Sequence, residues 1–92
     1  MKIVINRRFG GFSLSKEARD ILKVDQYEDD LDVRLSCKLV EMVEKDPEAA
    51  SGEFARLTVV DIPDDATDWF IDEYDGLERV IYVVNGKLQF IC

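Results

Sequence analysis

The chain contains no histidine, only two cysteines and only two prolines among its 92 residues. The missing histidine removes the side chain that most often transfers protons near neutral pH, and also the commonest metal ligand. Cys37 and Cys92 are far apart in sequence and form no Cys-x-x-Cys pair, so neither a four-cysteine zinc site nor a disulfide framework can be built. We therefore expect no metal, no cofactor and a reduced setting.

Long apolar segments are also missing. The longest, Val80–Val84, is far shorter than the roughly 20 residues of a membrane-spanning helix, and the start, Met1-Lys2-Ile3, has no signal-peptide pattern. We expect a cytoplasmic protein without membrane contacts, located in the host cytosol if it comes from a phage. A chain of this length fits a single domain, residues 1–92.

Basic residues are scarce, since 12 Lys and Arg stand against 20 Asp and Glu, for a net charge of -8. Direct binding to nucleic acid is not expected, because phosphate contacts need clustered basic side chains. Residues 1–23 carry six bases and two acids, net +4, whereas residues 24–92 carry six bases and 18 acids, net -12. Folding can either cancel these charges, with Arg7 and Arg8 neutralising carboxylates, or leave an acidic surface.

The first half of the chain reads as a short strand over residues 2–5, a loop at Gly10-Gly11 and a helix near residues 15–23. A second helix begins after Ser36 and ends at Asp46-Pro47, because the residue before proline is pushed out of the helical region. The acidic segment 25–32 predicts a solvated loop, followed by an extended piece at residues 33–35. Residues 47–53 are expected to be a connection.

The second half predicts four strands, at residues 57–60, 68–74, 77–84 and 87–91. Asp75-Gly76 and Asn85-Gly86 favour two-residue type I′ hairpins between the last three strands. This register predicts one face for the helices to cover, made of Phe70, Ile81, Val83, Leu88 and Phe90. The sequence therefore predicts an α+β domain, a mainly antiparallel β-sheet with two helices packed on one face.

The same register creates a conflict of charge at the first hairpin. Glu73 faces Glu78, with Asp75 at the tip, and directly opposed like charges destabilise a strand pair. A cation from the same chain, a divalent metal or a basic partner protein would relieve this repulsion. A calcium loop centred on Gly76 would put Ile71 and Tyr82 at ligand positions, so the EF-hand motif is absent.

Catalysis is not expected. With 20 acids in the chain many carboxylate pairs arise by chance, and nothing singles out one of them as a general acid or base. The glycine-rich loop offers a different chemistry: Arg7, Arg8, Gly10 and Gly11 could hold a phosphate or a nucleotide. This loop lacks the Gly-Lys-Ser/Thr end of a Walker motif, and a purely structural reading, in which Phe9 and Phe12 pin a tight turn, stays open.

Three stretches resemble a family of small proteins encoded by bacteriophages and prophages, whose members are generally described as proteins of unknown function. The stretches are Asn6-Arg7 with Gly10-Gly11-Phe12 and Leu14-Ser15, then residues 61–65, then residues 71–78. Family members share an "NR-x-x-GGF-x-LS" start and a late "IPDD … EYDG-x-E" stretch. Here Arg8 stands where a cysteine is frequent, and residues 83–92 replace a shorter basic tail that contains His and Trp. The resemblance implies a phage context and no particular chemistry.

These observations lead to the hypothesis of a non-enzymatic phage protein that presents an acidic surface to a basic groove of a host protein, for example as an anti-CRISPR-like inhibitor. A phosphate- or nucleotide-binding module is the alternative. Self-association through an edge strand at Val80–Val84 is a third possibility, so monomer and homodimer both stay open. Trp69 faces Tyr82 on the side of the sheet opposite the predicted core. These two aromatic residues are candidate binding anchors, and the alternative that they only stabilise the sheet stays open. The predicted contacts are Asp64, Asp65, Trp69, Glu73, Asp75, Glu78 and Tyr82.

Overall fold

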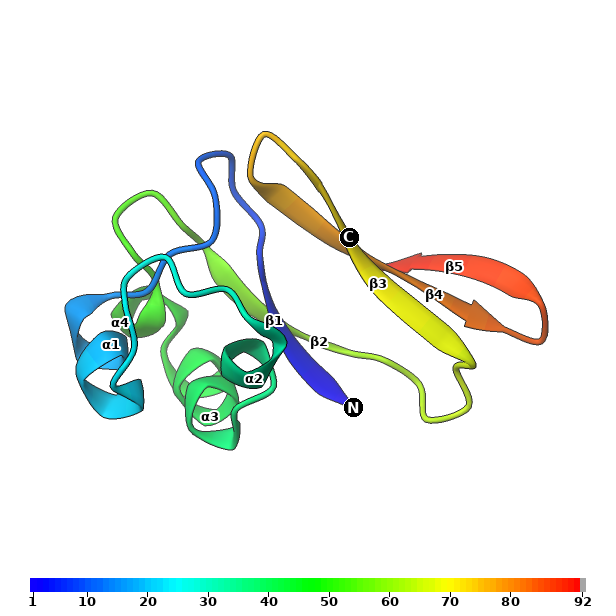
Figure 1. Ribbon diagram of the computed structural model, residues 1–92, viewed down its shortest axis with the longest axis horizontal. Coiled ribbons are helices and arrows are strands. Elements are labelled where there is room, and N and C mark those ends of the chain that lie inside the picture. The colour runs from blue at the N-terminus through cyan, green and yellow to red at the C-terminus, as the bar shows by residue number, and fades with distance from the viewer. Residues whose placement is uncertain (92) are drawn as a thin grey trace.

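A computed structural model describes residues 1–91, and Cys92 lies outside the described residues. The chain forms three layers: helices on one side, a two-stranded sheet in the middle and a three-stranded sheet on the other side (Figure 1). The helices are α1 (Lys16–Leu22), α2 (Leu31–Arg34), α3 (Cys37–Lys45) and α4 (Pro47–Ala50). The strands are β1 (Lys2–Asn6), β2 (Leu57–Asp61), β3 (Asp68–Tyr74), β4 (Leu77–Val84) and β5 (Lys87–Ile91).

The predicted α+β class is confirmed, with antiparallel pairing throughout and two main helices packed against the strands. The strands divide into two sheets, β1-β2 and β3-β4-β5, rather than forming one. Across residues 1–91, the helices are too short and too polar for any of them to cross a lipid bilayer.

The middle sheet is buried on both faces. Ile3 and Ile5 of β1 join a cluster with Val60, Ile62 and Val80, on the side of the three-stranded sheet. Val4 points the opposite way, into the cluster that the helices cover. This two-sided burial explains why residues 3–5 are continuously apolar, since alternation is expected only for a strand with one face in water.

The two main helices each begin directly after a serine at the N-cap position. The Ser15 hydroxyl accepts a hydrogen bond from the Ala18 amide at 3.1 Å, which satisfies one of the free N–H groups in the first turn of α1. Ser36 occupies the N-cap position of α3, and α3 ends at Lys45, just before Asp46-Pro47. Local sequence signals therefore set these boundaries.

Two short helices correct the predictions for the segments in which they lie. Residues 33–35 were expected to be extended, but α2 covers Leu31–Arg34, and four residues are too few to show a helical period. Residues 47–53 were expected to be an irregular connection, but α4 begins at Pro47. Proline suits the first position of a helix because its fixed φ is helical and its missing N–H would have no partner there.

The predicted register of the three-stranded sheet is confirmed, with Glu73 opposite Glu78 and Trp69 opposite Tyr82. Strand β4 is central, so the prediction of an edge strand at Val80–Val84 is wrong. Asp75 and Asn85 both have a φ of 53°, as the type I′ turns require at their first central residue.

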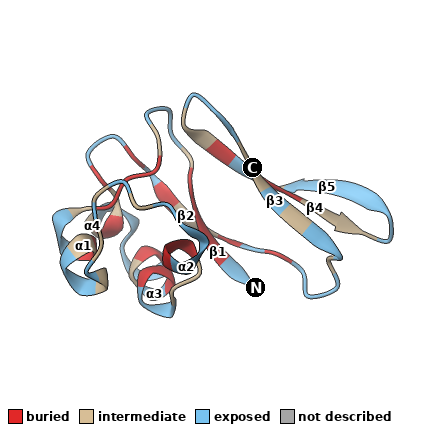
Figure 2. Ribbon diagram, in the orientation of Figure 1, coloured by how far each residue is buried: buried red, intermediate tan, exposed pale blue. Residues whose placement is uncertain are grey.

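The prediction of which face of this sheet is buried is wrong. Trp69, Ile71, Tyr82 and Ile91 pack against the cluster around Ile3 and Ile5. On the predicted face Phe70, Leu88 and Phe90 are exposed and Val83 is half-buried, and only Ile81 is buried. Figure 2 shows β5 exposed along almost its whole length. Both faces of the sheet carry large apolar side chains, so the alternation within these strands does not say which face the middle layer covers.

Candidate protein-binding surface

A buried ion pair joins the three-stranded sheet to α2. Two guanidinium nitrogens of Arg34 donate hydrogen bonds of 2.8 Å, one to each oxygen of the Glu78 carboxylate. The side chains of Arg34 and Glu78 are only 5% and 7% exposed. This two-point contact is the strongest ionic geometry that the two side chains can form.

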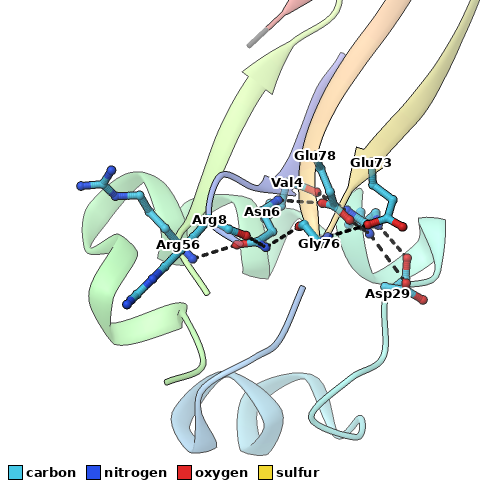
Figure 3. A network of polar contacts seen from close by, with 9 residues as sticks. Val4, Asn6, Arg8, Asp29, Arg56, Glu73, Gly76 and Glu78 are labelled. Carbon is cyan, nitrogen blue, oxygen red and sulfur yellow. Dashed lines mark hydrogen bonds and ion pairs between the residues drawn. The ribbon is translucent and has the colours of Figure 1, made fainter. Parts of the chain in front are cut away.

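Further hydrogen bonds satisfy the remaining polar groups of the pair (Figure 3). The backbone amide of Asn6 donates to the Glu78 carboxylate at 2.7 Å, and Arg34 donates to the carbonyls of Val4 and Asp29 at 3.2 and 2.7 Å. The guanidinium also lies 4.3 Å from the centre of the Phe12 ring. Every buried side-chain nitrogen and oxygen in residues 1–91 has a partner, so the burial of the two charges is compensated.

The predicted conflict between Glu73 and Glu78 is therefore resolved within the chain. Arg34 supplies the cation for Glu78, and Glu73 accepts a hydrogen bond of 2.7 Å from the Gly76 amide in the turn. Glu78 was predicted to be a surface contact for a partner. Its burial corrects that prediction, because a carboxylate held by Arg34 and Asn6 is not accessible.

The glycine-rich loop holds the tip of the β3–β4 hairpin. The Gly10 amide donates to the Asp75 carbonyl at 3.1 Å, and the Asn6 side chain donates to the Gly76 carbonyl at 2.7 Å. A Cβ atom at Gly76 would lie 2.1 Å from the Gly11 nitrogen, which is closer than any side chain can approach. Gly11 and Gly76 therefore let two backbone segments pack directly against each other.

These contacts weaken the phosphate-binding alternative. The amide of Gly10 is already bonded within the chain, and Arg7 donates to the Glu78 carbonyl. Arg8 is exposed and lines a cavity of about 910 Å³ together with Arg56, but Asp46, Glu48 and Glu53 line the same cavity. Three carboxylates beside two guanidinium groups oppose the binding of an anion.

Two acidic segments lie side by side around the buried pair. Arg34 is 3.8 Å from the Asp29 carboxylate as well as bonded to Glu78, and Glu73 is the cross-strand neighbour of Glu78. Segment 25–32 therefore lies next to the hairpin tip, as Figure 3 shows for Asp29, Glu73 and Glu78. We call this region the acidic surface, consisting of Asp25, Glu28, Asp29, Asp30, Asp32, Glu73 and Asp75. All of these are exposed except Glu28, which is half-buried.

The carboxylates of segment 25–32 are close enough to affect each other's ionisation. A side-chain hydrogen bond with Asp30 raises the pKa of Glu28, and repulsion from Asp30, Asp25 and Asp29 adds to the effect together with burial. Five of the eight residues in this segment are acidic, and this density of acids is the feature of the sequence that could have predicted an acidic surface here. The segment was predicted only to be a solvated loop, and none of its carboxylates was among the predicted contacts.

The other predicted contacts lie elsewhere. Asp64 and Asp65 are exposed between β2 and β3, at the opposite end of β3 from Asp75 and so roughly 20 Å away along a strand of this length. The terminal amino group of Met1 is 3.1 Å from Asp61 and 3.5 Å from Asp64. The hydrogen bond that this amino group donates to the Asp61 carboxylate raises its pKa, so it stays positively charged and neutralises part of the negative charge there.

Trp69 and Tyr82 do not lie on a solvent-exposed face of the sheet. They are opposite each other as predicted, but both are partly buried against the cluster around Ile3 and Ile5. Their role as exposed anchors is thereby corrected, because the middle sheet covers their face. Of the seven predicted contacts, the structure brings Glu73 and Asp75 together and separates them from Asp64 and Asp65.

Within residues 1–91, no group of three His, Cys, Asp or Glu side chains is arranged to hold a metal ion. Cys37 is a free, exposed thiol at the start of α3. Comparisons of the chain with family models, curated proteins and solved structures give no match.

Proposed function

We propose that this chain is a non-enzymatic, phage-type binding protein that presents its acidic surface to a basic groove of a host protein in the host cytosol. The observation that supports this proposal is the gathering of seven carboxylates from segment 25–32 and the β3–β4 tip, next to an arginine whose charge is already neutralised by Glu78. A groove that binds nucleic acid in a defence complex has the complementary charge, which makes an anti-CRISPR-like inhibitor the form of this function that we favour. The resemblance to phage proteins supports the same context.

The acidic surface is fastened to the core at several points. The Leu14 amide donates to the Gln26 carbonyl at 2.9 Å, and Arg34 donates to the Asp29 carbonyl. On the hairpin side, Gly10 donates to the Asp75 carbonyl. Carboxylates on a fixed backbone lose little conformational freedom when a partner binds, and their common field speeds the encounter with a basic surface.

Charge reversal on the acidic surface tests this proposal. The variant carries Asp30→Lys and Asp32→Lys, and the matched control carries Asp64→Lys and Asp65→Lys, two exposed acids far from the acidic surface. Each tagged protein is used to capture binding proteins from a bacterial lysate at low salt, and the affinity for the main captured protein is measured by calorimetry. We expect the first variant to lose at least about tenfold in affinity, because each unit charge at contact distance contributes roughly 1 kcal/mol in a water-like medium.

The control and the salt dependence make the result specific. Binding of the unaltered chain should weaken steeply as salt rises, and the Asp64/Asp65 variant should retain most of its affinity. Circular dichroism verifies that both variants are folded. Equal affinity for the unaltered chain and the Asp30/Asp32 variant, or an equal loss in both variants, would contradict the role of the acidic surface.

A further inference from the structure

The three-stranded sheet has an uncovered face on the side away from the middle layer. We call it the outer face; the register places on it Phe70 and Tyr74 of β3, Leu77, Ile81 and Val83 of β4, and Leu88 and Phe90 of β5. Phe70, Leu88 and Phe90 are 48%, 59% and 53% exposed, and Tyr74 is 75% exposed. Among residues 1–91 no other element covers these side chains, as the exposed β5 in Figure 2 illustrates.

The outer face is nearly neutral in a strongly acidic molecule. Its charged residues are Asp68, Asp72 and Arg79, and the last two form an ion pair with an N–O distance of 3.0 Å. The Arg79 guanidinium also lies 5.0 Å from the centre of the Phe90 ring. One net negative charge on this face contrasts with -8 for the whole chain, so two copies repel each other least when they approach through it.

We propose that a second copy of this chain packs on the outer face, sheet against sheet. A fully exposed aromatic side chain presents roughly 150–250 Å². The exposed fractions of Phe70, Tyr74, Leu88 and Phe90 therefore amount to roughly 450 Å² per copy. Two such faces with their rims bury on the order of 1,000 Å², which is the lower limit for a specific interface, so a weak and concentration-dependent dimer is expected.

The geometry of the sheet suits such a dimer. Facing sheets pack about 10 Å apart with their strands within about 30° of each other, and a two-fold axis brings the same side chains of both copies together. Ile81 lies between Phe70 and Phe90 on neighbouring strands and is only 7% exposed, so the accessible surface of this apolar strip comes from Phe70 of β3 on one side of Ile81 and from Leu88 and Phe90 of β5 on the other. Glu73 belongs to the other face of the sheet and segment 25–32 lies beside it, so the acidic surface stays accessible in the dimer.

The mass in solution tests the proposal. Sedimentation equilibrium over a wide range of concentrations should show the mass of the unaltered chain rising from 10.6 kDa toward twice that value. Leu88→Asp and Phe90→Asp should each raise the dissociation constant at least tenfold, because each places a charge in the apolar strip. The matched control is Gln89→Asp, an exposed position on the same strand but on the opposite face, and it should dissociate like the unaltered chain.

Leu88 and Phe90 are already exposed in the single chain, so both variants should fold, and circular dichroism verifies this. A chain that stays monomeric at every concentration would overturn the proposal, as would a dimer that survives Leu88→Asp and Phe90→Asp. Equal dissociation by Gln89→Asp would indicate edge-to-edge pairing of β5 and would also overturn it. None of these outcomes bears on the acidic surface, because the two surfaces share no residue.

Discussion

At the scale of single residues, Arg34 and Glu78 hold the layers together. Moving two charges out of water is costly, and their attraction offsets this cost only because the contact is two-pointed and the other polar atoms are bonded. The pair connects residues 44 positions apart, from α2 to β4, and the Asn6 amide adds β1 to the same carboxylate. Such a network favours one arrangement of the three elements over others.

Replacing Arg34 by Met should destabilise the protein by about 3–5 kcal/mol, because Glu78 would then be a buried charge without a partner. Urea unfolding followed by tryptophan fluorescence measures the change. The matched control is Arg79→Met, which breaks an exposed pair with Asp72 and should cost less than about 1 kcal/mol. Adding Glu78→Gln to Arg34→Met should recover part of the lost free energy of unfolding, because glutamine is neutral and its side-chain oxygen can still accept a hydrogen bond from the backbone amide of Asn6. No difference between Arg34→Met and Arg79→Met would contradict the importance of the buried pair.

At the scale of elements, the β3–β4 hairpin is fixed by its tip as well as by its strands. Asp75-Gly76 makes the turn, and the same two residues contact the loop at Gly10 and Gly11. One glycine thus meets two requirements: its φ of 86° suits the turn, and its lack of a side chain allows the close approach to Gly11. The second hairpin has only the first requirement, because nothing lies within 4 Å of a Cβ atom at Gly86.

This difference gives a matched pair of substitutions. Gly86→Ala should cost about 1–2 kcal/mol, the price of placing an L-residue in the left-handed region. Gly76→Ala should cost clearly more, at least about 3 kcal/mol, because the same strain is joined by a clash that separates the tip from the loop. Thermal unfolding measures both, and hydrogen exchange of the Gly10 amide should speed up only in Gly76→Ala. Equal losses for the two variants would show that the contact between tip and loop contributes nothing.

At the scale of the whole molecule, charge and apolar area are distributed unequally. The acidic surface and the outer face belong to different sides of the three-stranded sheet, one with seven carboxylates and one with almost no net charge. The helices and the middle sheet supply the main core, so neither surface is needed to cover it. Two separate surfaces can therefore serve two separate contacts.

The repulsion within the acidic surface should appear in the pH dependence of stability. The pKa of Glu28 is higher in the folded chain than in the unfolded chain. Its contribution to the free energy of unfolding is therefore fully present below the unfolded-state pKa and is lost as the pH rises through the folded-state pKa. Glu28→Gln should therefore melt at the same temperature as the unaltered chain, or lower, at acid pH, and at a higher temperature at neutral pH. Thermal scans over this range measure the difference, and a variant that is less stable at neutral pH would contradict the repulsion. Glu41→Gln, on the exposed side of α3, serves as the control.

The sequence by itself determined the parts of the fold that depend on near neighbours. Ser15 marks the start of α1 and Asp46-Pro47 marks the end of α3, while Asp75-Gly76 and Asn85-Gly86 fix the register of three strands, because capping and turn formation act within a few residues. The opposition of Glu73 and Glu78 and the need for a cation followed from that register alone.

Only the tertiary structure decided which cation that is and which face of the sheet is buried. Arg34 reaches Glu78 from another element, and no local pattern connects the two positions. Trp69 and Phe70 lie on opposite faces of β3 and are equally suited to a core. The face with Trp69 is the buried one because it packs against Ile3 and Ile5 of the middle layer. The acidic surface likewise arises because Arg34 lies between the Asp29 carboxylate and Glu78, which brings together two segments that are distant in the chain.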